Sequence, residues 1–231
     1  RDVRSLSRHS GGHPERMTSC PFKKEEDTMK TCFTLPAGYA ELRQIDLQKD
    51  PRLALVVNAL GICIFVFGAF IGQLFVPLHT FYSVSGETVL YFVRLAATFG
   101  GIILYIFLHE FVHGIFIKRY SGQKAEYGYT GMYAYAGSKA YFNKNNYLVI
   151  ALAPVVLWGT VLTVLLILLP EYWFWTVCLI QLSNLSGAAG DLYVFWTFSR
   201  LPEDILIQDT GVTMTIYAPV RRTDRTADTP A

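Results

Sequence analysis

The chain has 231 residues and a formal net charge of only +2, which gives no electrostatic reason to expect a nucleic-acid partner. Hydrophobic residues make up 52% of the chain and charged residues 16%, whereas a water-soluble domain of this length carries about a quarter charged residues. The apolar residues also occur in long uninterrupted runs, which is typical of a membrane protein.

Residues 1–34 precede the first apolar run and are mostly polar, with a charged stretch (KKEED) at 23–27. A segment of this composition cannot bury enough apolar surface to fold, so we expect a disordered N-terminal extension. We also expect a disordered tail at 221–231. The residues between them, 35–220, form the predicted membrane domain.

Four apolar stretches are long enough to cross about 30 Å of hydrocarbon as helices, which takes about 20 residues. They are 53–76, 89–117, 147–169 and 173–198. Residues 125–142 alternate aromatic with small side chains, which indicates a strand or hairpin, and 211–219 also alternate. The predicted fold class is therefore an all-α polytopic membrane protein with four transmembrane helices and a short cytoplasmic β-hairpin-like segment.

The distribution of Lys and Arg predicts the orientation in the membrane. Basic residues precede the first span and follow the second and the fourth, whereas the loops at 77–88 and 170–172 contain none. Because Lys and Arg concentrate in cytoplasmic loops, both termini and the loop after the second span are predicted to be cytoplasmic. We expect a multi-pass protein of the cell membrane.

The second span contains the sequence HEFVH, from His109 to His113. Histidines four residues apart project from one face of a helix, and pairs of this kind bind zinc. The intervening Glu110 can act as general base toward a water that the metal activates. Ionisable residues at membrane depth are costly, which favours a functional site over histidines that merely pack in the interior.

A catalytic zinc ion takes three protein ligands and leaves the fourth position to water. Asp191 is the only acidic residue deep inside another predicted span. At 1.5 Å per residue, His113, His109 and Asp191 lie roughly 6, 12 and 10 Å from the cytoplasmic ends of their spans. The three side chains are therefore predicted to meet at one level and hold Zn²⁺. The alternative for Asp191 is a helix-capping or hinge residue, because Gly187 and Gly190 could break the span.

Asn184 lies about two turns deeper than Asp191 in the same predicted span. Its amide can hydrogen-bond the backbone of a substrate, which makes it a candidate substrate-binding residue. It can equally bond a neighbouring helix. The sequence leaves both roles open.

HEFVH on one membrane helix, with Asn184 and Asp191 on a later one, resembles the site-2 proteases, which are intramembrane zinc metallopeptidases. The chain is more closely similar to a bacterial family of unknown function described as zincin membrane peptidases. This likeness runs from 35–47 (LPAGYAELRQIDL) to 201–219 (LPEDILIQDTGVTMTIYAP). The resemblance implies zinc held by His109, His113 and Asp191, with water activated by Glu110 and peptide bonds cleaved within or beside the membrane.

We therefore expect an intramembrane zinc metalloprotease whose partners are a membrane protein or peptide substrate and the lipid bilayer. The alternative is a catalytically inactive membrane adaptor with a structural or lost metal site. It is motivated by the order Gly190-Asp191, where site-2 proteases usually have Asp followed by Gly. Zinc-dependent hydrolysis of a lipid or another amide is a third hypothesis. The sequence does not specify the substrate or the oligomeric state.

Overall fold

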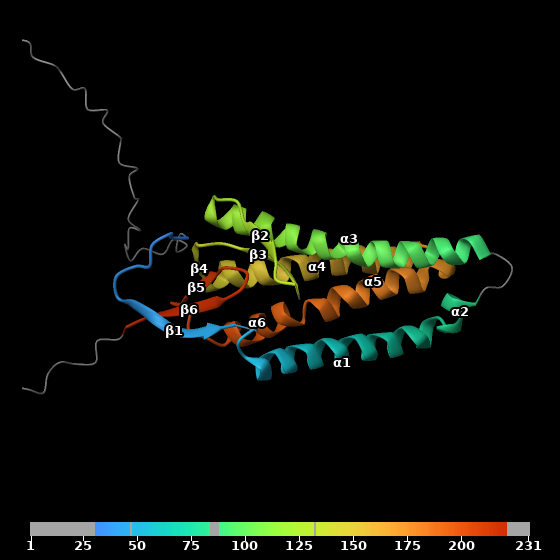
Figure 1. Ribbon diagram of the computed structural model, residues 1–231, viewed down its shortest axis with the longest axis horizontal. Helices are drawn as coiled ribbons and strands as arrows, with labels where there is room; N and C mark the ends of the chain where they lie inside the picture. Colours follow the sequence, from blue (N-terminus) through green and yellow to red (C-terminus); the bar gives the residue numbers. More distant parts are fainter. Residues whose placement is uncertain (1–30, 47, 84–87, 132, 221–231) are drawn as a thin grey trace, which may run out of the picture.

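A computed structural model describes residues 31–46, 48–83, 88–131 and 133–220. Most of the expected N-terminal extension (1–34) and the whole expected tail (221–231) lie outside the described residues. The described part is a bundle of long helices with two small β-sheets at one end (Figure 1).

Within the described residues, three helices are long and apolar enough to cross a membrane: α1 (Pro51–Phe75), α3 (Thr88–Ser121) and α4 (Lys144–Leu168). They correspond to the first three predicted spans. A short helix, α2 (His79–Tyr82), lies between α1 and α3. The Asp50 side chain caps α1, and the Asn143 side chain caps α4, in each case by accepting backbone N–H groups of the first turn.

The fourth predicted span is divided into two helices rather than one. After a 3₁₀ turn, η1 (Glu171–Trp173), the chain forms α5 (Phe174–Gly187) and α6 (Ala189–Ser199), and neither alone reaches the length of a transmembrane helix. The break falls at Ala188, whose backbone leaves the helical region. Glycine has a low helix propensity, so Gly187 and Gly190 favour an interruption that a count of apolar residues does not detect.

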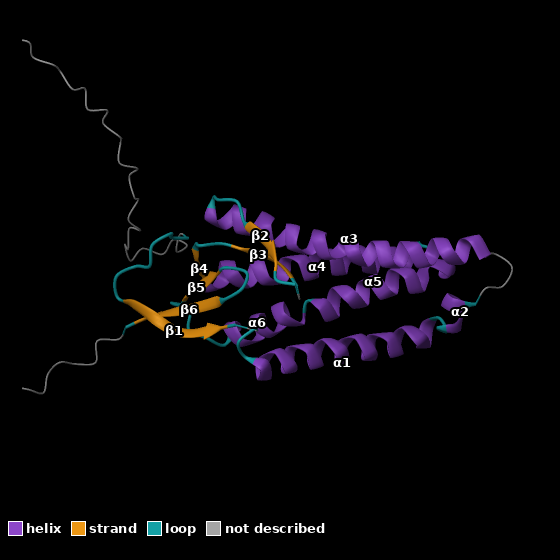
Figure 2. Cartoon of the chain, in the orientation of Figure 1, coloured by secondary structure: helices purple, strands orange, loops and turns teal. Residues whose placement is uncertain are grey.

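In the part of the chain that the structure describes, the strands all lie at one end of the helix bundle (Figure 2). The hairpin predicted within 125–142 is confirmed as β2 (Glu126–Tyr129) paired antiparallel with β3 (Ala134–Gly137). The following residues, β4 (Tyr141–Asn143), instead join a four-stranded antiparallel sheet of order β1-β6-β5-β4. Its other strands are β1 (Tyr39–Ile45), β5 (Leu206–Asp209) and β6 (Met214–Pro219), and β6 confirms the alternating pattern seen in 211–219.

The buried core is concentrated where the sheet meets the helices. Its large, completely buried apolar side chains come from β4, β5, β6, the end of α6 and the loop that follows it, and they are Phe142, Phe198, Ile205, Ile207 and Ile216. The long helices, in contrast, expose large apolar side chains along their outer faces, such as Phe67 (66%), Phe107 (66%) and Ile167 (77%). A surface of this kind is unfavourable in water and matches contact with lipid.

The β2–β3 hairpin lies against α3 and the β5–β6 turn because small residues allow close approach. A Cβ atom on Gly114 of α3 would meet the Tyr127 hydroxyl, and one on Gly137 would meet the backbone of Thr210. The backbone N–H of Ser138 also donates to the carbonyl of Asp209 at 2.6 Å. The hairpin is thereby fixed beside the part of α3 that carries the two histidines.

Candidate metal centre

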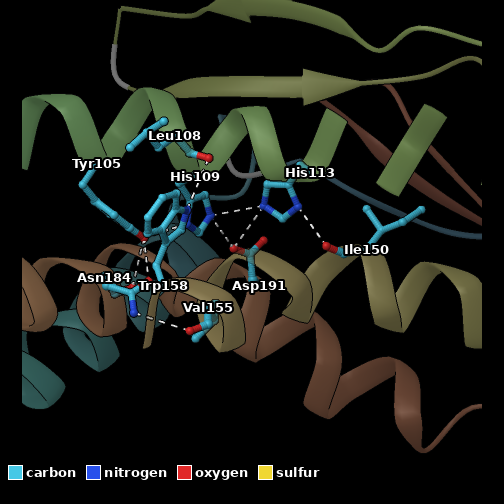
Figure 3. Close-up of polar contacts among 9 residues, drawn as sticks. All are labelled: Tyr105, Leu108, His109, His113, Ile150, Val155, Trp158, Asn184 and Asp191. Carbon is cyan, nitrogen blue, oxygen red and sulfur yellow. Dashed lines mark hydrogen bonds and ion pairs between the residues drawn. The ribbon is translucent and has the colours of Figure 1, made fainter. Parts of the chain in front are cut away.

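His109 and His113 occupy successive turns of α3 and turn their rings toward Asp191 in the first turn of α6 (Figure 3). The Asp191 Oδ2 atom lies 3.1 Å from His109 Nε2 and 3.5 Å from His113 Nε2. The two Nε2 atoms are 3.2 Å apart. The structure thus brings the three predicted ligands together at one level, as the depth argument anticipates.

This triangle has the dimensions of one face of a tetrahedral zinc site. Nitrogen and oxygen ligands lie about 2.0–2.2 Å from zinc, so neighbouring ligand atoms of a tetrahedron are separated by about 3.4 Å. The three observed separations, 3.1, 3.2 and 3.5 Å, bracket that value. Two imidazoles and one carboxylate form a donor set that suits zinc, with room for a fourth ligand.

His113 is oriented by a backbone carbonyl. Its Nδ1 atom lies 2.9 Å from the carbonyl oxygen of Ile150 in α4. A carbonyl can only accept, so the Nδ1 atom carries the proton and donates it. In the neutral ring the Nε2 atom then presents its lone pair to His109 and Asp191.

His109 is oriented by a chain of buried side chains. The Tyr105 hydroxyl lies 2.6 Å from His109 Nδ1 and donates to Asn184 Oδ1 at 2.9 Å. Because the hydroxyl proton is used toward Asn184, His109 Nδ1 is the donor to Tyr105, and its Nε2 atom also presents a lone pair. The Asn184 amide is fixed in turn by donating to the carbonyl of Val155 and to Gln181 Oε1.

The two chains of hydrogen bonds place two nitrogen lone pairs and a carboxylate around one point. Lone pairs at 3.2 Å repel each other, and the nearby carboxylate oxygen adds negative charge. A cation at their common centre removes this repulsion. Fixed Nδ1–H donors of this kind orient metal-bound histidines and increase their basicity. The polar contacts therefore fit a metal ion better than three side chains that serve packing alone.

Glu110 lies between the two histidines in sequence and lines the same cavity, which has a volume of about 560 Å³. The side chain is half-buried, and its carboxylate is within hydrogen-bonding reach of the backbone of Ala136 in β3. His109, His113 and Asp191 line this cavity too. A general base must lie in the same cavity as the reacting groups, so that it can reach the proton that it removes. Glu110 meets this condition.

The cavity also contains a carboxylate that the sequence did not indicate. Asp209, at the end of β5, lines the cavity and accepts hydrogen bonds from the Tyr147 hydroxyl and the backbone N–H of Gly211. Burial raises the pKa of Asp209 above its usual range. The only sequence signal was a turn pattern, Asp209-Thr210-Gly211, which is common in hairpins and does not mark a site.

Asn184 is fully buried, and its amide is engaged by α3 and α4. Of the two roles open to it, this placement favours the bond to neighbouring helices over contact with a substrate. The sequence motif does not include Tyr105, although its spacing from His109 gives a signal. It lies four residues before His109, so both side chains project from one face of the same helix.

Replacing Tyr105 by Phe removes the hydroxyl that joins His109 to Asn184 and leaves both buried groups without this partner. We expect Tyr105→Phe to weaken zinc binding by about 10- to 100-fold, the usual effect of losing a group that orients a ligand. Affinity can be measured by competition with a chelator in detergent. Tyr82→Phe, at an exposed tyrosine of α2, is the matched control and should bind as wild type. Equal zinc affinity in the two variants would contradict the orienting role of Tyr105.

Part of the chain is similar to a known protein family. Residues 102–206 match the model of a protein family, DUF3267, described as "Putative zincin peptidase". This segment includes His109, Glu110, His113 and Asp191. No curated protein and no solved structure matches the chain. The matched family supports a metallopeptidase of the zincin type, and such an enzyme implies zinc.

Proposed function

We propose that this protein is an intramembrane zinc metalloprotease that hydrolyses peptide bonds of membrane-associated protein substrates. The observation that carries the proposal is the triangle of His109, His113 and Asp191 ligand atoms, with Glu110 beside it in one cavity between apolar helices. The family match supports the metallopeptidase class. The location between membrane-length helices supports a substrate that is itself associated with the membrane.

Each residue has a distinct part in the proposed mechanism. Zinc held there would supply a bound water of lowered pKa and a Lewis acid for the scissile carbonyl. His109, His113 and Asp191 would hold the metal at the wall of the cavity that they line. The Glu110 carboxylate takes a proton from the attacking water and delivers it to the departing amine nitrogen.

The walls of the cavity support an extended substrate that reaches the site from the bilayer. Val57 and Asn58 of α1 and Ile102 and Ile106 of α3 are among the apolar and polar residues that line this cavity. A helical substrate must unwind before hydrolysis, because its carbonyls are already hydrogen-bonded. The strand β3 lies at the edge of its two-stranded sheet and can pair with an unwound segment by strand addition.

We also propose four crossings of the membrane, with α5 and α6 together forming the fourth. The strands before α1, between α3 and α4, and after α6 all lie at the same end of the bundle (Figure 1). This is the arrangement expected when α1, α3, α4 and the α5–α6 pair alternate in direction. The positive-inside rule places this end, and both termini, in the cytoplasm of a cell-membrane protein.

Cysteine labelling in whole cells tests this orientation. A cysteine at Glu171, in the turn between α4 and α5, should react with a membrane-impermeant maleimide in intact cells. A cysteine at Lys139, exposed between β3 and β4, should react only after the membrane is permeabilised. Labelling should be measured in a background in which the natural cysteines are replaced. The opposite pattern would contradict the proposed orientation, and labelling of both positions in intact cells would contradict the four crossings.

Glu110→Gln tests the proposed catalytic role. The amide keeps the size of the side chain but cannot take the proton, so we expect cleavage to fall by at least about 100-fold. Zinc content should stay at the wild-type level, because Glu110 is not a proposed ligand. The substrates are synthetic single-span peptides in liposomes, and new N-termini are labelled and identified by mass spectrometry. Glu126→Gln, at an exposed glutamate in β2, is the control and should cleave as wild type.

Equal cleavage by Glu110→Gln and wild type would show that the hydrolysis does not use this residue as its base. Two results together would favour the inactive membrane adaptor. Zinc-loaded wild-type protein would cleave no peptide of the set, and Glu110→Gln would reproduce every effect of the wild-type protein in cells. Release of fatty acid from the liposome lipids, or of an amine from an amide-linked lipid, would instead support the hydrolysis of a lipid.

A further inference from the structure

The helix α4 contains a proline in its interior, Pro154, which is almost completely buried. Proline has no backbone N–H and therefore cannot donate to the carbonyl four residues earlier in the helix. In α4 that carbonyl belongs to Ile150. The proline ring also crowds this carbonyl and favours its displacement from the helix axis.

The carbonyl that Pro154 leaves without a helical donor is the one that orients His113. His113 Nδ1 lies 2.9 Å from the Ile150 oxygen, and Figure 3 shows this contact on the side of the ring opposite Asp191. The imidazole thus supplies the hydrogen bond that the helix cannot make. A carbonyl already engaged by an N–H group along the helix would be a weaker acceptor and would point away from the ring.

We propose that Pro154 is a positioning residue of the metal centre. By freeing the Ile150 carbonyl, it fixes the Nδ1–H tautomer of His113 and directs Nε2 toward His109 Nε2 and Asp191 Oδ2. The proposal rests on the proposed zinc site for its functional meaning. The hydrogen bond and the tautomer are properties of the protein without metal, so they can be measured independently.

A second contact places α4 behind the other histidine as well. The Val155 carbonyl, next to Pro154, accepts from Asn184, which holds Tyr105 and through it His109. This contact is longer, at 3.5 Å, and involves a carbonyl whose helical donor, the N–H of Gly159, is present. The proline therefore acts on His113 in particular, whereas His109 depends on side chains.

Proline also bends membrane helices for reasons of packing, and the test must separate the two effects. Pro154→Ala restores the backbone N–H and removes the ring. The matched control replaces Pro154 with lactic acid, which introduces a backbone ester that has neither the ring nor the N–H. If the missing N–H is what matters, the two variants must differ. If only the ring or the bend matters, they must behave alike.

Two readouts are measured on the full chain in detergent. The first is the ¹⁵N shift pattern of the His113 ring in metal-free protein with labelled histidine, which reports the tautomer. The second is zinc affinity by competition with a chelator. For Pro154→Ala we expect a mixture of His113 tautomers and zinc binding weakened by about 10- to 100-fold. The lactic acid variant should keep the wild-type tautomer and bind zinc within about threefold of wild type.

The proposal would be overturned if Pro154→Ala kept the wild-type tautomer, or if the lactic acid variant changed as Pro154→Ala does. Thermal unfolding of both variants identifies a loss of fold, and in that case Pro154→Gly, which also restores the N–H, replaces Pro154→Ala. In a further outcome, Pro154→Ala changes the His113 tautomer but the wild-type protein binds no zinc. This outcome would refute the proposed metal centre and leave the positioning of His113 by Pro154 established.

Discussion

The candidate metal centre depends on two imidazole nitrogens, His109 Nε2 and His113 Nε2, that are held 3.2 Å apart with their lone pairs facing each other. The HEFVH motif alone does not enforce this orientation of the lone pairs, because a neutral histidine can carry its proton on either nitrogen. The choice is made by acceptors on the far side of each ring, the Ile150 carbonyl for His113 and the Tyr105 hydroxyl for His109. Both are buried within the helix bundle, away from competing water.

The surrounding helices can be understood as the supports of this arrangement. The helix α3 supplies both rings, and α4 supplies the carbonyl behind one of them. The interruption at Ala188 starts a new helix so that Asp191 lies in its first turn, where a carboxylate is stabilised by the helix dipole. The hairpin β2–β3, held by contacts at Gly114 and Gly137, brings β3 beside Glu110. Each element thus contributes one constraint to a single cavity.

The sequence predicted the parts of this site that follow from spacing along a helix. HEFVH placed His109 and His113 on one face, and distances along the spans placed Asp191 at their level. Three of the predicted spans are single helices, and the β2–β3 hairpin follows from the alternation of aromatic and small residues.

The sequence could not predict contacts that depend on how helices rotate against each other. Asp209 reaches the cavity because β5 pairs with β4, a strand far from it in the sequence, as well as with the neighbouring β6. Asn184 is buried and bonded to Tyr105 because α5 turns this face toward α3. Apolar composition does not encode which face of a helix meets its neighbour. The break at Ala188 was visible only as two nearby glycines, which membrane helices also tolerate without interruption.

The proposed function requires that His109, His113 and Asp191 together hold one metal ion. The most direct test is the metal content, by elemental mass spectrometry, of detergent-purified wild type, Asp191→Ala and Asp204→Ala, in which an exposed carboxylate is removed as a control. We expect about one zinc per chain in wild type and Asp204→Ala and a large loss in Asp191→Ala. Zinc retained in Asp191→Ala, or no metal in folded wild type, would contradict the three-ligand centre.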